Sequence, residues 1–231
     1  MPTAWNSTNI RNIPESIPKI AIAIPYIGKF YSEWVEKTYL SLIATPSNLY
    51  QKVTFLSKVP SLPVARDLLV GQALKINADY IFFLDTDHVF ENPSDPNVAL
   101  DQLFQVMNRS KDSKDSKIVS GLYRAKQKTG FNYAMWIKQD NGFVPIAEWT
   151  GNWLSVDVTG LGCCLIDMEV FKNIPRPWFH WDMGEEMSED FYFHQLAKKH
   201  GYSIHVFTDI KLSHLGELKI KSDGTIVLQE V

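Results

Sequence analysis

Short apolar runs alternate with helix-period segments through the first half of the chain. Compact β-rich runs bounded by polar residues or proline are typical of buried parallel strands. Such runs cover residues 19–24, 53–56, 80–84 and 117–123. Between them, apolar residues recur at helical spacing over 32–44, 65–76 and 98–107. This alternation of strands and helices predicts a mostly parallel sheet covered by helices.

The second half of the chain loses this regular alternation. Its pattern predicts antiparallel strands and loops, then two helices, a last core strand and a terminal hairpin around Ser222-Asp223-Gly224. The strands are expected within 142–149, 154–165 and 203–215, and the helices over 168–174 and 188–200. The expected fold class is therefore α/β, with a mostly parallel central sheet and a mixed second half.

Composition narrows the class of protein. The 231 residues carry a formal charge of −3 and are 45% apolar, which suits one globular domain and argues against a large basic face for nucleic acid. No stretch approaches the roughly 20 apolar residues of a membrane helix, and the polar N-terminus does not resemble a signal peptide. The adjacent Cys163 and Cys164 do not suggest a disulfide framework. We therefore expect a cytoplasmic, single-domain protein without a transmembrane segment.

The sharpest chemical feature is Asp85-Thr86-Asp87, directly after the apolar run YIFFL. Alternation along a strand would point both carboxylates the same way, at the edge where open α/β sheets bind ligands. Two hard oxygen donors there suit Mg²⁺ or Mn²⁺ shared with substrate phosphates. The alternative is ordinary turn chemistry, in which Asp is common.

Two further acidic residues and a histidine extend this picture. Glu189 and Asp190 follow Ser188 at the start of an expected helix, where acids also serve ordinary helix capping and where the helix dipole should lower the pKa of Asp190. His214 ends the last core strand, where it could complete a metal site or simply be a surface residue. An imidazole ligand favours Mn²⁺ over Mg²⁺.

Taken together, these segments resemble the GT-A family of nucleotide-sugar-dependent glycosyltransferases, closest to small single-domain, family 2-like members, including viral ones. The matching segments are Ile20–Pro25, Ala65-Arg66-Asp67, Tyr80–Asp87, Gly160-Leu161-Gly162, Glu189-Asp190 and His214-Leu215-Gly216. The resemblance implies a three-layer GT-A sandwich over 1–231, with a nucleotide-sugar-binding half at about 19–123, an acceptor-side half at about 124–216 and a C-terminal hairpin at 217–231.

The resemblance also implies a role for each matching residue. Asp87 and His214 would ligate the metal, and Asp85 would reach it through water or hold the ribose. Asp190 would be the base that deprotonates the acceptor hydroxyl, with Glu189 as its less favoured substitute. The residues expected to bind the nucleotide sugar are Pro25, Tyr26, Arg66, Thr86, Asp157, Gly160 and Gly162. The implied cofactor is Mn²⁺ or Mg²⁺, and the implied donor is a UDP-sugar first and a GDP-sugar second.

Some candidates have equally ordinary interpretations. Trp153 and Trp181 are expected on the side of a saccharide or glycoconjugate acceptor, although large aromatic residues also fill cores. Gly160 and Gly162 would allow close approach of a sugar, or simply bend the chain. His88 is expected to support the site from behind or to be exposed, rather than to be a ligand.

Three functions remain open from the sequence. The first is a metal-dependent glycosyltransferase, in which a divalent ion stabilises the leaving diphosphate and a carboxylate activates the acceptor. The second is a metal-dependent nucleotidyltransferase of similar fold, a class that usually has a Gly-rich, Arg-containing loop after the first strand. The loop Pro25–Phe30 has one Gly and no Arg, which disfavours it. The third is a non-catalytic carbohydrate-binding domain, which leaves the acidic pair at 189–190 unexplained.

Overall fold

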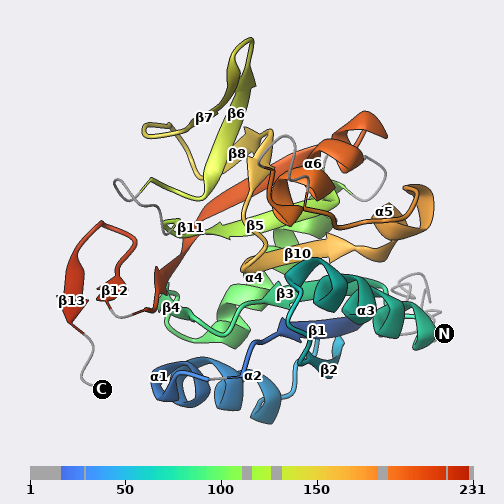
Figure 1. Ribbon diagram of the computed structural model, residues 1–231. Coiled ribbons are helices and arrows are strands. Elements are labelled where there is room, and N and C mark those ends of the chain that lie inside the picture. Colours follow the sequence, from blue (N-terminus) through green and yellow to red (C-terminus); the bar gives the residue numbers. More distant parts are fainter. Residues whose placement is uncertain are drawn as a thin grey trace, which may run out of the picture.

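The computed structural model describes residues 17–28, 30–110, 116–125, 132–181, 187–216 and 218–228, with only the backbone of Ser110, Leu218, Lys219 and Leu228. A large twisted sheet runs through the molecule, with helices on both of its faces (Figure 1). The expectation for the polar N-terminal segment lies outside the described residues.

The main sheet is mixed: its first three strands are parallel, as expected, but antiparallel β10 separates β3 from β5. Its principal order is β13-β12-β11-β5-β10-β3-β1-β2, and β4 and β8 also pair with β11. Strand β1 is parallel to β2 and β3, and β5 is parallel to β11, whereas β10 lies antiparallel between β3 and β5. The strands are β1 (Lys19–Pro25), β2 (Gln51–Ser57), β3 (Tyr80–Leu84), β4 (His88–Asn92), β5 (Ile118–Leu122), β8 (Trp153–Val156), β10 (Cys163–Asp167), β11 (Ile204–His214), β12 (Leu218–Ile220) and β13 (Ile226–Leu228).

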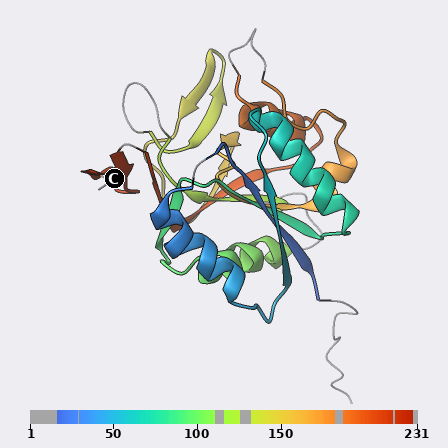
Figure 2. The same ribbon diagram turned by 60° about the horizontal axis from the view of Figure 1, so that its bottom comes forward.

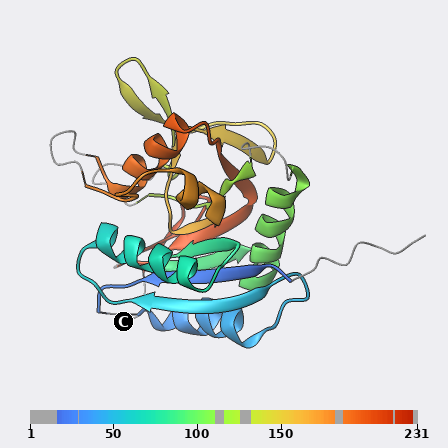
Figure 3. The same ribbon diagram turned by 90° about the vertical axis from the view of Figure 1, so that its right-hand side faces the viewer.

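Side-chain alternation along the strands divides the core into two layers. In β1, Ile20, Ile22 and Ile24 face one layer, and Ala21 and Ala23 face the other. The isoleucine side packs against α1 (Ser32–Trp34), α2 (Leu40–Ala44) and α4 (Pro96–Met107). The alanine side packs against α3 (Leu62–Lys75), α5 (Met168–Asn173) and α6 (Glu189–Lys199). Figures 2 and 3 show these two helical layers on opposite faces of the sheet, which confirms the α/β class and its three layers.

Several elements differ from the sequence expectation. The helix at 32–44 contains a π-helical segment, η1 (Val35–Tyr39), and a 3₁₀ turn, η2 (Asn108–Ser110), follows α4. The run 154–165 is not continuous, because the chain turns between the strands β8, β9 (Val158–Thr159) and β10. A small second sheet, in the order β7-β6-β9, contains the unforeseen β6 (Met135–Gln139) and also β7 (Gly142–Pro145), which lies within the strand expected at 142–149.

The most consequential unforeseen element is β4, directly after Asp87. It pairs antiparallel with β11, and the register places His88 opposite His214. Two residues separated by 126 positions therefore meet beside the end of β3.

None of the helices in the described part of the chain is both long and apolar enough to cross a membrane.

Candidate active site

The two acids of the Asp85-Thr86-Asp87 segment face different partners. Strand β3 ends at Leu84 and the chain turns, so the strict alternation of a strand does not extend to Asp87. Asp85 accepts hydrogen bonds from Arg66 Nη2 at 3.1 and 3.2 Å. Asp87 instead lies 2.9 Å from His88 Nδ1 and 3.1 Å from His214 Nε2. The structure thus brings Asp87 and His214 together and places Asp85 in a separate cluster.

We call the first group, Asp87, His88 and His214, the histidine cluster. Each residue offers one ligand atom, and these atoms lie within 4.8 Å of one another. The two imidazole rings stack with centroids 4.4 Å apart, and His88 is only 2% exposed. His88 is therefore not the exposed residue that one sequence interpretation allowed.

Hydrogen bonding fixes the orientation of His214. Its Nδ1 lies 2.8 Å from the backbone oxygen of Arg124, which can only accept, so Nδ1 carries a proton. In the neutral imidazole, Nε2 then presents a lone pair to the carboxylate of Asp87, 3.1 Å away. Two acceptors facing one another require a cation between them or a proton on Nε2. A backbone oxygen that orients the far nitrogen of a histidine is also the usual support for a metal ligand.

The imidazoles also control the charge of Asp87. Burial alone would raise the pKa of its carboxyl group, but His88 and His214 hold that pKa well below its ordinary value. Asp87 is therefore ionised at neutral pH and available as an anionic ligand.

The second group, which we call the arginine cluster, consists of Arg66, Asp85 and Glu189. Arg66 is 2% exposed, and its Nε donates to Glu189 Oε1 at 3.4 Å. Its guanidinium carbon lies 5.2 Å from the ring centre of Phe83. Burial alone would lower the pKa of Arg66, but the surrounding carboxylates raise it above its ordinary value. Nη1 has no hydrogen-bond partner among the described residues, so one buried donor is left over.

Asp190 is the second residue of α6, next to Glu189 of this cluster, and its pKa differs from the sequence expectation. Its Oδ1 accepts from the Ser188 hydroxyl and, at 2.9 Å, from the Phe191 amide. The helix start was expected to lower its pKa. Instead, burial and the neighbouring Glu189 raise the pKa of Asp190 to about 6, against the smaller opposing effects of these hydrogen bonds and of Arg66. A carboxylate with that pKa is a better proton acceptor near neutral pH than an ordinary aspartate.

The glycines at 160 and 162 have a structural reason to lack side chains. A Cβ on Gly160 would lie 2.0 Å from the Tyr123 hydroxyl oxygen, and a Cβ on Gly162 would lie 2.5 Å from His88 Cε1. The Gly162 amide donates to that same Tyr123 hydroxyl at 2.9 Å. The space next to these glycines is therefore filled by the protein's own aromatic side chains.

The remaining nucleotide-side candidates are spread along the sheet edge. Pro25 ends β1, and the Tyr26 amide donates to the Ser57 backbone oxygen at 3.0 Å. The Tyr26 ring stacks on Phe30 at 4.6 Å. Thr86 lies in the turn between the two acids. Asp157 lies elsewhere, where it pairs with Lys198 and accepts from the Lys138 amide at 2.6 Å.

The two candidate tryptophans lie in different surroundings. Trp153 is the first residue of β8, and its ring stacks on that of His205 in the neighbouring strand β11, with the ring centroids 4.5 Å apart. Trp181 is 44% exposed, and its indole Nε1 donates to Glu189 Oε2 at 2.9 Å, which joins it to the arginine cluster. Trp181 is therefore hydrogen-bonded to an acid of the arginine cluster, whereas Trp153 packs on the ring of His205.

Sequence reasoning missed Tyr123 and the full part played by His88. Tyr123 is buried, lies edge-on to the His88 ring at 4.2 Å, and has a pKa raised well above its ordinary value by burial and by Asp85. The sequence placed Tyr123 at the end of an expected strand, but it did not show that this residue would lie near the acidic segment. The strand register that places His88 opposite His214 could not be predicted from the sequence around either residue.

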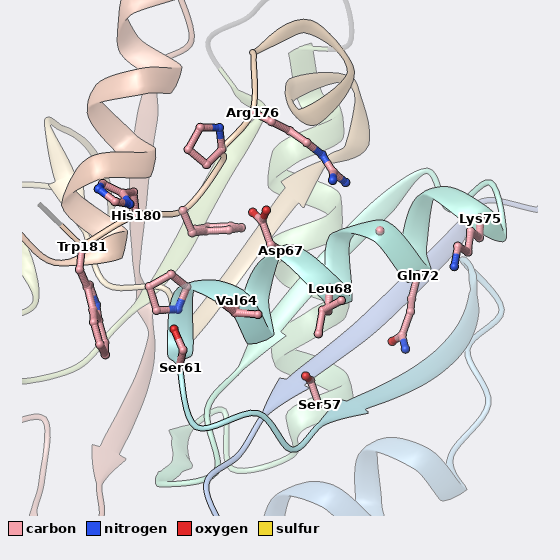
Figure 4. Close-up of a pocket in the computed structure, with 14 residues that line it drawn as sticks. Ser57, Ser61, Val64, Asp67, Leu68, Gln72, Lys75, Arg176, His180 and Trp181 are labelled. Carbon is pink, nitrogen blue, oxygen red and sulfur yellow. The ribbon is translucent and has the colours of Figure 1, made fainter.

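A groove of about 850 Å³ was also not foreseen. It runs along α3 and is bounded by the segment 176–181 and by the end of β2 (Figure 4). Trp181 and Ser61 lie near one end of α3, and Lys75 lies at the other (Figure 4).

Comparison with known proteins supports the fold. No family model and no curated protein matches this chain. Among solved structures, A197 from STIV is similar with a TM-score of 0.62 and 20% identity, over 93% of this chain and 95% of that chain. This likeness shows a shared fold and does not bear on activity.

Looser matches include two enzymes of nucleotide-sugar and sugar-phosphate chemistry by their names. UDP-glucose pyrophosphorylase in complex with UDP-glucose has a TM-score of 0.49 and 10% identity, over 86% of this chain and 93% of that one. Mannose-1-phosphate geranyltransferase from Thermus thermophilus has a TM-score of 0.47 and 11% identity, over 84% of this chain and 75% of that one. Neither match is close enough to carry an argument about function.

Proposed function

We propose that this chain is a metal-dependent glycosyltransferase that moves a sugar from a nucleoside diphosphate sugar to an acceptor hydroxyl. The observation that carries the proposal is the facing of His214 Nε2 and Asp87 Oδ2 at 3.1 Å, while His214 Nδ1 is committed to a backbone oxygen. Next to this arrangement, Asp190 has the raised pKa that a general base needs.

The residues present fit a divalent ion. Asp87 and His214 would hold it, and His88 offers a third donor, since one of its ring nitrogens lies within 4.8 Å of the ligand atoms of the other two residues. A set of one carboxylate and two imidazoles suits Mn²⁺ better than Mg²⁺, which prefers oxygen ligands. When bound, the ion would supply positive charge that stabilises the diphosphate as it leaves.

The arginine cluster reduces the negative charge beside the proposed metal site. Arg66 neutralises Asp85 and Glu189, so the acids that do not hold the ion do not repel an anionic donor as strongly. Asp190 is left to accept the proton of the acceptor hydroxyl. Its pKa of about 6 keeps it mostly ionised at neutral pH while making proton transfer to it less unfavourable than transfer to an ordinary aspartate.

Release of nucleoside diphosphate tests the proposal directly. We expect UDP or GDP to be released from a panel of UDP- and GDP-sugars only when Mn²⁺ is present, and faster when saccharides are added. Asp190→Asn should abolish transfer and leave donor binding intact, whereas Glu148→Gln, a change at an exposed acid that belongs to neither cluster, should leave transfer unchanged.

Other products identify the competing functions. Pyrophosphate released from a nucleoside triphosphate and a sugar phosphate would replace the proposal with a nucleotidyltransferase. Saccharide binding without release of any nucleotide product would favour a carbohydrate-binding domain.

A further inference from the structure

The groove along α3 starts at the candidate active site and leads away from it. One end is formed by Ser61 and Trp181, and Ser57, where β2 ends, borders the groove beneath Leu68 in the view of Figure 4. The other end is formed by Gln72 and Lys75, near the last turn of α3. At a rise of 1.5 Å per residue, the helix gives the groove a length of roughly 20 Å. Its volume of about 850 Å³ lies at the upper end of the range for ligand pockets.

The lining of the groove alternates apolar and hydrogen-bonding groups. Val64 and Leu68, one helical turn apart, are 48% and 50% exposed and together form an apolar row along the groove. Gln72 continues the same row one turn further, and its Oε1 is shielded from solvent without a hydrogen-bond partner among the described residues. An apolar row that ends on an unsatisfied acceptor suits a ligand with both C–H faces and hydroxyl donors.

Charge in the groove is nearly balanced. Arg176 and Asp67 face one another across it, and Arg176 lowers the pKa of Asp67 against the larger, opposite effect of burial. Lys75 is the only other charged residue along the lining as described. This lining therefore lacks the dense positive charge that a polyanion such as nucleic acid would need.

Trp181 presents an aromatic surface at the active-site end. Its indole N–H is held by Glu189 at 2.9 Å, and Glu189 in turn accepts from Arg66 at 3.4 Å. The edge of the ring is thus fixed, while 44% of the side chain remains exposed. Saccharide rings pack their C–H faces on aromatic surfaces held in this way.

We propose that the groove binds an extended, uncharged saccharide chain, with one terminal sugar against Trp181 and the rest of the chain along Val64, Leu68 and Gln72. The inference rests on the proposed function in one respect: the saccharide bound in the groove is taken to be the acceptor of the transferred sugar. The apolar row, the unsatisfied acceptor and the fixed indole each match one feature of a sugar ring, and the length of α3 accommodates several rings.

Titration with defined tetrasaccharides tests the groove without donor or metal. Cellotetraose, maltotetraose, mannotetraose and chitotetraose are each added to the full chain up to about 10 mM, a range that captures millimolar dissociation constants. We expect at least one of them to shift the indole N–H resonance of Trp181, which Trp181→Phe identifies by its disappearance. No saturable shift with any of the four would overturn the proposal.

A matched pair of substitutions locates the binding site. Leu68 in the groove and Leu40 on α2 are both leucines with 50% exposure, so Leu68→Arg and Leu40→Arg carry a similar folding risk. We expect Leu68→Arg to weaken tetrasaccharide binding about 10-fold or more, which corresponds to about 1.4 kcal/mol, and Leu40→Arg to leave it unchanged. A thermal melt of each variant checks that its melting temperature equals that of the wild-type protein. Equal tetrasaccharide binding by the two folded variants would also overturn the proposal.

The two proposals fail in different ways. If a tetrasaccharide binds in the groove but no nucleoside diphosphate is released from any donor, the groove stands and the glycosyltransferase proposal fails. If Mn²⁺-dependent transfer occurs with the same rate in Leu68→Arg and in wild type, the enzyme proposal stands and the groove proposal fails.

Discussion

The arginine cluster and the histidine cluster lie side by side, yet they neutralise their acids by different means. Asp85 and Glu189 are compensated by a guanidinium that stays charged at any ordinary pH. Asp87 is compensated by two imidazoles, which are common metal ligands. The first arrangement gives a fixed structure, and the second leaves a site that a cation can occupy. The acidic segment thus combines an acid paired with arginine and an acid that could bind a cation, only two positions apart.

Removal of the fixed cation should have the largest effect. Arg66→Met leaves Asp85 and Glu189 without their buried partner, and breaking a buried pair in this way typically costs about 3–5 kcal/mol. Urea denaturation at pH 7 measures the loss in the free energy of unfolding. A loss below about 1 kcal/mol would show that water screens this cluster as it screens a surface pair, and the contrast between the two clusters would then disappear.

Metal binding should separate the two acids of the segment. We expect Mn²⁺ to stabilise the wild-type protein by about 2.7 kcal/mol at 100 times its dissociation constant, which a thermal melt detects. Asp87→Asn should lose this stabilisation, and Asp85→Asn should retain it, because Asp85 lies outside the histidine cluster. The opposite result would move the metal site to the arginine cluster.

The raised pKa of Asp190 should appear in the pH dependence of stability. Its native pKa of about 6 lies above the unfolded value of roughly 3.9, so the native state keeps the proton longer. The contribution of this group to the free energy of unfolding therefore falls as pH rises from about 4 to about 6, and stays low above that.

Asp190→Asn removes this dependence. We expect the variant to be more stable than wild type by about 2 kcal/mol above pH 6 and to lose the advantage below pH 4. Chemical denaturation at pH 4, 5, 6 and 7 gives the difference curve. A constant difference across that range would show that Asp190 titrates normally and would remove the support for its role as a base.

The close contact behind the histidine cluster should have a smaller effect. A Cβ on Gly162 would lie 2.5 Å from His88 Cε1, so Gly162→Ala should push the ring aside, cost about 1–2 kcal/mol and weaken Mn²⁺ binding.

Gly71→Ala on α3 is the matched control for that change. Its nearest neighbour would be Arg176 Nη2 at 3.9 Å, so alanine fits and should stabilise the helix by about 0.5–1 kcal/mol. Equal changes in stability at the two glycines would show that a side chain at position 162 does not disturb His88.

Local sequence patterns were enough to predict the fold class and most of its strands. The run Tyr80–Leu84 is apolar throughout and forms β3 with those bounds, because every residue of a central strand is covered on both faces. Strand β4 was missed because it begins directly after the acidic turn, and its pairing with β11 depends on residues far along the chain. Register between distant strands is set by the folded sheet and leaves no local periodicity.

The chemistry of the site was predictable in its residues and less so in their partners. Asp87 and His214 were expected together, and they are. The pKa of Asp190 was expected to fall because the sequence shows only the helix start, whereas burial and Glu189, which act through the folded structure, raise it. The family resemblance placed Arg66 near the nucleotide, and the sequence did not show that it would be enclosed between two acids.

Consecutive residues of α3 serve opposite sides of the helix. Arg66 points inward to Asp85 and Glu189, and Asp67 points outward, where the backbone amides of Phe179 and Trp178 and the charge of Arg176 act on it. The same turn of helix therefore anchors both the acidic interior and the wall of the groove. This shared turn offers a route for coupling between the two sites, and any such coupling is reciprocal: if a ligand in the groove changes affinity at the sheet edge by some factor, occupancy of the edge must change affinity in the groove by the same factor.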